Sequence, residues 1–225
     1  METSKDIIRK SKLKVDNIIL NDAKYLLKNK EIPFKEKIVK GEFSKVVKRE
    51  LDENNYDLVL MSFEKGCILN YRLLDEVNVP VWIESDGEGK SLLAVCSNLA
   101  PNQKVPEFSI KLSKCLGWDL HMLYVIDMGD NVEVDETCQR SDRKSEKDLD
   151  LVGYKFVEKM REKGINVRLV KGVLEKEIVK AAEKFGVNLV IVGREQKKKN
   201  IFGLPVKNIK KKMAEKSSYS LLFFN

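Results

Sequence analysis

The sequence predicts an α/β protein with a doubly wound parallel sheet, and an internal repeat is the first observation behind this prediction. Residues 171–193 read KGVLEKEIVKAAEKFGVNLVIVG, and residues 40–62 read KGEFSKVVKRELDENNYDLVLMS. Lys40 aligns with Lys171 and Ser62 with Gly193, so the offset stays at 131 residues without a gap. The second observation is that each copy combines a helical apolar stripe with a short apolar strand, the pattern of a βαβ crossover.

The later copy has the clearer pattern. Ile165, Val167 and Leu169 alternate with polar residues, which predicts a strand before the turn at Lys171. Residues 189–192 form a continuous apolar run, typical of a strand that is covered on both faces. Between them the spacing predicts a helix with one apolar face, made of Leu174, Ile178, Ala181, Ala182 and Phe185.

The earlier copy has the same order of elements. Phe43, Val47 and Leu51 form the helical stripe, residues 58–61 the following strand, and residues 34–39 the preceding strand, with Phe34 opposite Ile165. Upstream, one further helix is expected, with an apolar face formed by Ile8, Val15, Ile19, Ala23 and Leu26. Downstream, a short helix is expected at 68–76, followed by a strand at 80–83 that Pro80 opens, as edge strands tolerate.

A charged, glycine-containing linker at residues 86–89 predicts the domain boundary. We therefore expect one domain at 1–88 and another at 89–225.

The second domain continues the alternation of strands and helices. Strands are expected at 92–95 and 122–126, and a charged surface loop at 127–148. The repeat unit, a lysine-rich loop, a last helix near Ile209 and Met213, and a last strand at 221–224 complete the order βαβαβαβαβ. The first two helices have apolar positions at Phe108, Ile110, Leu112 and Leu116, and at Leu151, Tyr154, Phe156 and Met160.

Composition limits the class of protein. The chain has 225 residues, of which 43% are hydrophobic and 34% charged, as in soluble globular proteins. No apolar run approaches the roughly 20 residues of a membrane span, and the first residues lack a secretory signal, so we expect a cytoplasmic protein. The four cysteines are far apart and His121 is the only histidine, which indicates neither a zinc site nor a disulfide framework.

The net charge of +7 and the pI near 9.0 leave a nucleic-acid partner as an alternative. The densest basic segments are 197–199 and 210–212. Acidic residues are also abundant, and the aromatic residues do not alternate with the lysines. A solvated lysine-rich surface is therefore the favoured interpretation, and nucleic-acid binding is the less favoured one.

Residues 91–225 resemble the universal stress protein domain. Residues 91–127 match the layout of its opening strand, helix and second strand, and residues 165–194 match its third strand, third helix and fourth strand. Residues 13–85 resemble the later two-thirds of a second such domain, without its opening strand, helix and strand. The resemblance implies a tandem protein of the stress response with a truncated first repeat and a Rossmann-like, adenine nucleotide alpha hydrolase-like fold.

Members of this family that bind ATP have an aspartate at the end of the first strand and a G-x2-G-x9-G-[ST] loop after the fourth. Glycines let backbone N–H groups approach phosphates. Here Cys96 replaces the aspartate, and the loop begins with Gly193 but has Gln196 at its second glycine. Its closing positions hold a lysine and an asparagine, and the corresponding loop of the first segment, 62–67, is too short for a triphosphate. We therefore expect no ATP binding.

A low-affinity ATP or anion sensor is the alternative, because basic residues of this loop can hold phosphate by charge. If a nucleotide binds at all, the resemblance implies a degenerate site formed by Cys96, Asn98, Val125, Gly193, Arg194, Gly203, Lys207 and Asn208.

Catalysis has no support in the sequence, which contains neither a G-x-S-x-G elbow nor a P-loop. We expect His121 to be structural and Cys96 to be a buried thiol rather than a reactive one. The expectation is a protein without catalytic residues, metal or cofactor that acts through protein contacts. The final strands, 79–83 and 221–224, are expected to pair with each other within one chain or between two chains in a dimer. No membrane partner is expected.

Overall fold

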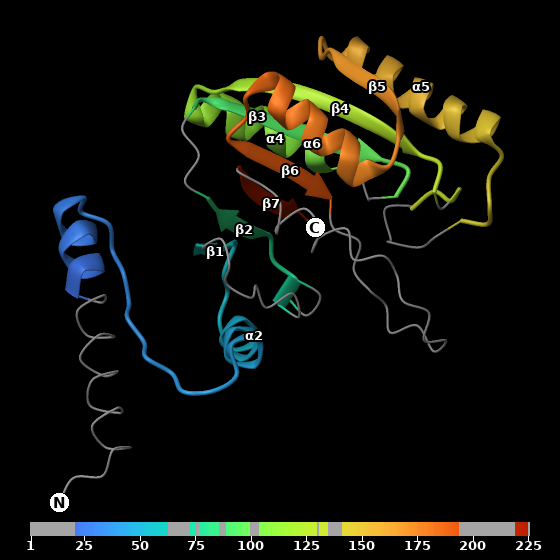
Figure 1. Cartoon of the computed structure of the whole chain (residues 1–225). Coiled ribbons are helices and arrows are strands. Elements are labelled where there is room, and N and C mark those ends of the chain that lie inside the picture. Colours follow the sequence, from blue (N-terminus) through green and yellow to red (C-terminus); the bar gives the residue numbers. More distant parts are fainter. Residues whose placement is uncertain are drawn as a thin grey trace, which may run out of the picture. The chain divides into compact units, whose positions relative to one another are not determined.

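The computed structural model describes residues 21–62, 73–74, 77–85, 89–99, 104–129, 131–134, 141–193 and 219–224. The chain divides into two compact units, Met1–Glu42 and Phe43–Asn225. In the first unit, residues 21–29 are helical, and Lys24 forms an ion pair with Glu36 at 2.7 Å. The second unit contains a seven-stranded sheet (Figure 1).

The strands of the sheet lie in the order β1-β2-β7-β6-β3-β4-β5. Every neighbouring pair is parallel except β2 and β7, which are antiparallel. The predicted α/β class with a doubly wound parallel sheet is therefore confirmed, and the antiparallel pair of β2 and β7 departs from it among these strands. The strands are β1 (Val59–Ser62), β2 (Val81–Glu84), β3 (Ser91–Ser97), β4 (Asp119–Asp127), β5 (Val167–Gly172), β6 (Leu189–Gly193) and β7 (Ser220–Phe224).

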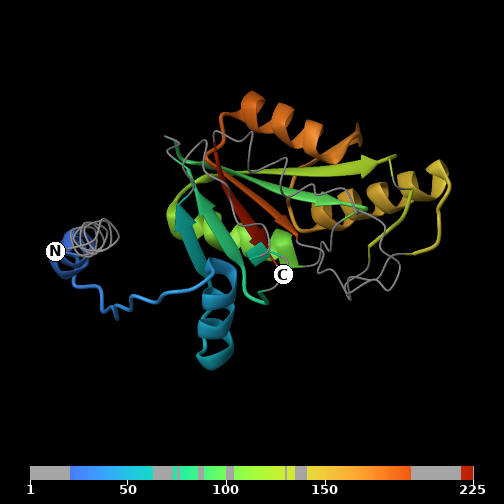
Figure 2. The same ribbon diagram turned by 60° about the horizontal axis from the view of Figure 1, so that its bottom comes forward.

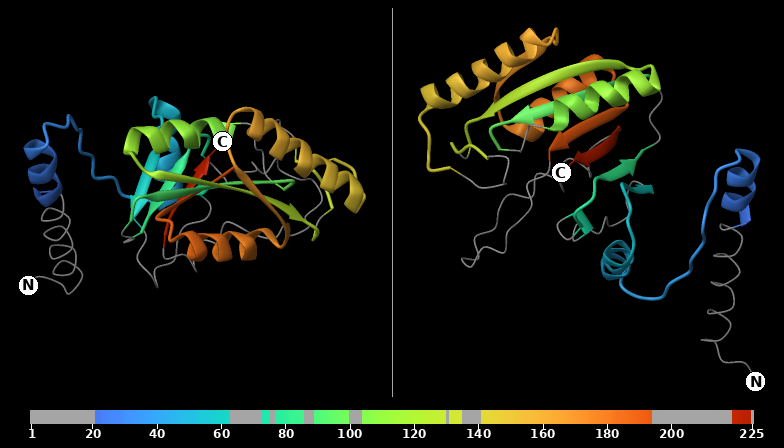
Figure 3. Two further views of the ribbon diagram at one scale, coloured as in Figure 1. Left: turned by 90° about the horizontal axis from the view of Figure 1, so that it is seen from above. Right: turned by 180° about the vertical axis from the view of Figure 1, so that it is seen from behind.

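Helices cover both faces of the sheet, as the turned views show (Figures 2 and 3). Helices α4 (Lys104–Leu116) and α5 (Glu146–Glu162) lie on one face, and α6 (Leu174–Phe185) lies on the other. Alternate residues of a strand point to opposite faces, so the sheet separates two apolar clusters. On β3, Leu93 and Val95 belong to the first cluster, under α6, and Leu92, Ala94 and Cys96 belong to the second.

The two copies of the repeat form matching elements. Helix α2 (Phe43–Glu53) and strand β1 correspond to α6 and β6, and both the helix starts and the strand ends lie 131 residues apart. In α2, Val47 and Leu51 pack against the first cluster, whereas Phe43 is largely exposed. The sheet is continuous from β1 to β5, and the boundary expected after residue 88 falls between β2 and β3 and stays a prediction.

The strand predicted at residues 34–39 is wrong, because this segment has no regular secondary structure and its Phe34 and Ile38 are exposed. The later copy shows the physical reason. There the corresponding strand, β5, pairs with β4. Among the described residues of the earlier copy, none forms a counterpart of β4, so a strand at 34–39 lacks there the neighbour whose backbone groups it needs.

The apolar face predicted for α5 is also wrong in part. The helix begins at Glu146, inside the stretch predicted as a loop, with Ser145 and Asp148 forming a capping box. Leu151 and Tyr154 are exposed, and the buried residues are Leu149, Gly153 and Met160. Their spacing of four and seven residues puts them on one side of the helix with Phe156, opposite Leu151 and Tyr154.

Several predicted elements lie outside the described residues. They are the first 20 residues, most of the helix at 68–76, where only 73–74 are described as helical, and the loop and last helix at 194–218. Within the described part of the chain, no helix combines the length and the apolar character that crossing a membrane requires.

Candidate functional site at the carboxyl edge of the sheet

The carboxyl ends of β3, β4 and β6 meet at the edge of the sheet where open α/β folds place their ligands. Strand β3 lies between β4 and β6. Helix α4, which follows β3, and helix α6, which precedes β6, lie on opposite faces of the sheet (Figure 3). The strand order reverses between β3 and β6. Ser97, Asp127 and Gly193 end the three strands here, and Asn98 directly follows Ser97. A nucleotide site of the predicted kind would lie at this edge.

Cys96 occupies the position expected for an acidic residue, and its side chain is inside the protein. The residue is fully buried and belongs to the second apolar cluster, next to Tyr124 on the neighbouring strand. Burial raises the pKa of the thiol far above its usual value. The thiol therefore stays protonated at neutral pH, which agrees with the expectation of a buried rather than a reactive cysteine.

Asn98 is buried, and its hydrogen bonds connect three segments of the chain. Its Nδ2 donates to the carbonyl oxygens of Asp127, at 3.1 Å, and Val132, at 2.8 Å. Its Oδ1 accepts from the backbone N–H of Asp127 at 2.7 Å, and its own carbonyl accepts from the N–H of Val134 at 2.8 Å. With both amide protons and the side-chain oxygen used, Asn98 fastens the end of β4 and residues 132–134 to the end of β3.

Asp127 carries a carboxylate that is only 4% exposed. One oxygen accepts from the N–H of Gly129 and the other from the N–H of Leu174, each at 2.7 Å. Leu174 is the first residue of α6, and the residue before it, Val173, makes no side-chain cap. Asp127 thus caps α6 from a different strand, and its negative charge lies at the positive end of the helix dipole.

Among the described residues, the predicted site positions Asn98 and Gly193 lie at the carboxyl edge of the sheet, whereas the other two are buried in apolar clusters. Cys96 belongs to the second apolar cluster, whereas Val125 belongs to the first, on the opposite face of the sheet. Gly193 ends β6 and pairs with Phe224 of β7. The remaining predicted positions, Arg194, Gly203, Lys207 and Asn208, lie outside the described residues. The predicted nucleotide contacts stay a prediction.

Sequence reasoning missed Asp127, which it assigned to the start of a loop. Two signals were available. Asp127 directly follows the apolar run 122–126, so its carboxylate had to lie at the carboxyl edge of the sheet. In addition, α6 begins after Val173, which cannot cap a helix through its side chain, so another segment had to supply an acceptor.

His121, a further candidate reactive residue, packs against an aromatic ring. His121 stacks on Phe185 of α6, with ring centroids 4.3 Å apart and planes 9° apart, so its ring packs between sheet and helix. Among the described residues, no three His, Cys, Asp or Glu side chains gather in a way that could hold a metal ion.

No family model matches the sequence, and no curated protein matches it either. Solved structures do match at the level of the fold. A universal stress protein from Archaeoglobus fulgidus is similar with a TM-score of 0.65 and 13% identity, over 100% of this chain and 80% of that one. A candidate universal stress protein from Pseudomonas aeruginosa is similar with a TM-score of 0.65 and 12% identity, over 92% and 77%.

A protein of unknown function from Pseudomonas aeruginosa is similar with a TM-score of 0.63 and 13% identity, over 92% of this chain and 77% of that one. At such low identity the likeness is one of fold. The chain therefore has the architecture found in the two universal stress proteins.

Proposed function

We propose that this chain is a universal-stress-type cytoplasmic protein that works through protein contacts and neither binds ATP nor catalyses a reaction. One observation carries the first half of the proposal. The polar side chains at the carboxyl edge of the sheet, Asn98 and Asp127, already have hydrogen-bond partners within the protein. A ligand that binds them has to break these buried contacts, and each unmade buried hydrogen bond costs about 1–3 kcal/mol.

Cys96 supports the same conclusion. A carboxylate at the end of the first strand could accept hydrogen bonds from a ligand, but a neutral thiol is a weak donor and a weak acceptor. Cys96 is also directed into the apolar cluster beneath α4 and α5. The residue therefore contributes to packing, and β3 lacks at this position the acid that the ATP-binding members of the family use.

Strand β1 is the surface that we propose for protein contacts. Its counterpart β6 has a neighbour on each side, whereas β1 pairs only with β2 among the described strands. Leu60, the second residue of β1, is 65% exposed, and Tyr56 and Leu58, which precede the strand, are exposed as well. In this proposal the pairing of β2 with β7 joins the two repeats and leaves β1 as an uncharged outer strand, to which a partner can add a strand.

Calorimetric titration with ATP, in magnesium buffer at low salt, tests the ligand half of this proposal. We expect no saturable heat from the site that begins at Gly193. The matched sample is the Gly193→Ala variant, which removes the glycine where the family places phosphate. Saturable binding that this substitution abolishes would contradict the proposal and favour the low-affinity sensor.

Capture of partners from the source cell tests the contact half. We expect Leu60→Asp to reduce capture by the tagged chain, because a charge on the outer strand opposes strand addition. Leu151→Asp, on an exposed position of α5, is the control and should leave capture unchanged. Equal capture by all three proteins would reject β1 as the contact surface. Binding to nucleic acid, the second alternative, would instead weaken steeply as salt is raised.

A further inference from the structure

A small basic pocket lies between α6 and the strands β4 and β5, away from the ends of β3 and β6. It has a volume of about 80 Å³ and is lined by Leu123, Arg168, Val170, Glu177, Lys180, Ala181 and Lys184. Arg168 stands beside Leu123 on the neighbouring strand. Lys180 and Lys184 are four residues apart on α6, so they share one side of the helix. One strand, β5, and one helix, α6, thus bring three cations to the same place.

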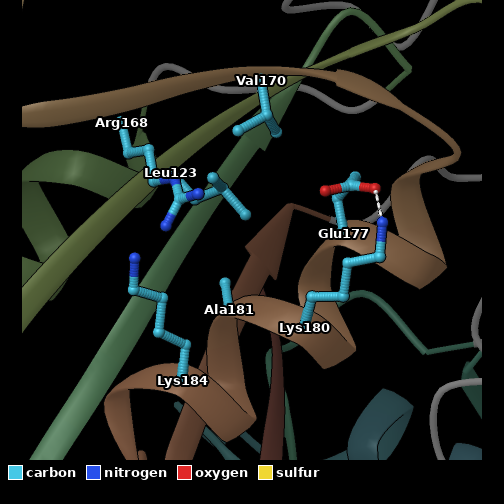
Figure 4. Close-up of a pocket in the computed structure, with 7 residues that line it drawn as sticks. All are labelled: Leu123, Arg168, Val170, Glu177, Lys180, Ala181 and Lys184. Atoms are coloured by element: carbon cyan, nitrogen blue, oxygen red, sulfur yellow. Dashed lines mark hydrogen bonds and ion pairs between the residues drawn. The ribbon is translucent and has the colours of Figure 1, made fainter.

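The cations differ in their partners. Lys180 donates to Glu177 at 2.6 Å, which holds both side chains on one side of the pocket (Figure 4). Arg168 and Lys184 point toward one another on the other side, with Ala181 between the two sides (Figure 4). Within the described part of the chain neither has a carboxylate partner, and Lys184 has only the ring of Phe185, 5.9 Å from its Nζ. Two like charges that face each other repel, and an anion between them would relieve this repulsion.

Charge and size select the kind of anion. Three cationic side chains against the single carboxylate of Glu177 leave the lining with a net charge of +2. A dianion neutralises this charge, whereas a carboxylate monoanion leaves half of it. Because one water needs roughly 10–15 Å³ of such a cavity, a pocket of about 80 Å³ holds several waters or one tetrahedral oxyanion.

The floor of the pocket is apolar. Leu123 is buried, and Val170 and Ala181 are largely covered. An apolar floor strengthens the attraction between an anion and the cations above it, because it excludes part of the surrounding water. It also offers a surface for the carbon atoms next to a phosphate group. Arginine adds geometric selectivity, because its planar guanidinium donates two parallel hydrogen bonds to a phosphate.

We propose that this pocket binds the phosphate group of a small phosphorylated molecule, with Arg168 and Lys184 as its direct ligands and Lys180 as a supporting cation. The site is separate from the carboxyl edge, which lies near the start of α6 at Leu174. It uses the last two turns of that helix instead. Phosphate binding in the basic pocket therefore does not depend on whether the carboxyl edge binds ATP.

A ¹H–¹⁵N NMR titration with inorganic phosphate, at low ionic strength, tests the proposal. We expect saturable shifts of the backbone amides of Val170 and Ala181. Arg168→Gln and Lys184→Gln should each weaken phosphate binding about tenfold, which corresponds to about 1.4 kcal/mol. The control is Lys176→Gln, which removes the same charge from an exposed position of α6 outside the pocket and should change the affinity less than about twofold.

Two further ligands separate the sources of binding. Phenyl phosphate should bind more tightly than inorganic phosphate if the apolar floor contacts the attached carbon atoms, and acetate should bind more weakly than both because it is a monoanion. Absence of saturable shifts with phosphate would overturn the proposal. Equal weakening by all three glutamine variants would also overturn it, because the effect would then come from general surface charge.

Discussion

Replacing Asp127 by asparagine tests the hydrogen bonds that its carboxylate accepts at the carboxyl edge of the sheet. Asparagine keeps the size and shape of the side chain but removes its charge and replaces one oxygen by an NH₂ group. In the folded protein both oxygens of Asp127 accept from backbone N–H groups, those of Gly129 and Leu174. Whichever way the amide is oriented, one of these two N–H groups then faces another donor.

The expected loss follows from two terms. A buried donor without an acceptor costs about 1–3 kcal/mol. Removing a negative charge from the start of α6 costs about 0.3–1 kcal/mol more. We therefore expect Asp127→Asn to lower the free energy of unfolding by about 1.3–4 kcal/mol. For a chain of this size each kcal/mol corresponds to about 2–4 °C, so Tm should fall by about 3–16 °C.

Urea denaturation followed by circular dichroism measures this free energy. Asp119→Asn is the matched control, because Asp119 is the exposed first residue of the same strand, β4. We expect the control to remain within about 0.5 kcal/mol of the wild type. Hydrogen exchange of the Leu174 amide should be faster in Asp127→Asn. Equal stability of the two variants, with unchanged exchange at Leu174, would refute the role of Asp127 as the cap of α6.

Two further predictions concern Gly89 and Cys96. Gly89 has φ of +152°, and a Cβ there would overlap Oδ1 of the buried Asn188, so Gly89→Ala should cost about 2–4 kcal/mol of stability, measured by urea denaturation. Gly164→Ala, at φ +73° in open space, is its control and should cost only about 1–2 kcal/mol. Similar losses of stability in the two variants would show that a Cβ at residue 89 does not overlap Asn188. Burial raises the pKa of Cys96 above its usual 9.0, so the unfolded state loses the thiol proton at lower pH than the folded state. The free energy of unfolding should therefore fall as pH rises above about 9, by up to about 1.4 kcal/mol per pH unit. The slope between pH 9 and 10 should be smaller in Cys96→Ala, and identical slopes would show that the thiol is not buried.

Local sequence patterns correctly predicted the helix and the strand after it in both copies of the repeat. The stripe of Leu174, Ile178, Ala181 and Ala182 is buried as expected, and β6 is buried along its whole length. These residues combine the right period with an immediately adjacent strand, so local preference and tertiary packing agree. The fold class followed from the same patterns.

The errors have a non-local origin. Residues 34–39 align with 165–170 but share only part of the apolar alternation that leads into β5, and the described residues of the earlier copy supply no neighbouring strand of the kind that β4 gives β5. In α5 two sets of apolar residues compete, and the positions of β4 and β5 decide that Leu149 and Met160 are buried rather than Leu151 and Tyr154. The capping of α6 by Asp127 joins residues 47 positions apart, which no local window can reveal.

A ¹H–¹⁵N NMR titration of the wild-type protein with magnesium ATP tests whether the carboxyl edge binds nucleotide, because it reports each site separately. We predict that the amides of Asn98, Asp127 and Gly193 do not shift, since the polar side chains at this edge already form hydrogen bonds within the protein. Shifts confined to Val170 and Ala181 would come from phosphate in the basic pocket and would show that the carboxyl edge itself binds no nucleotide. Saturable shifts of Asn98, Asp127 and Gly193 would contradict the prediction, and would show that the edge binds nucleotide.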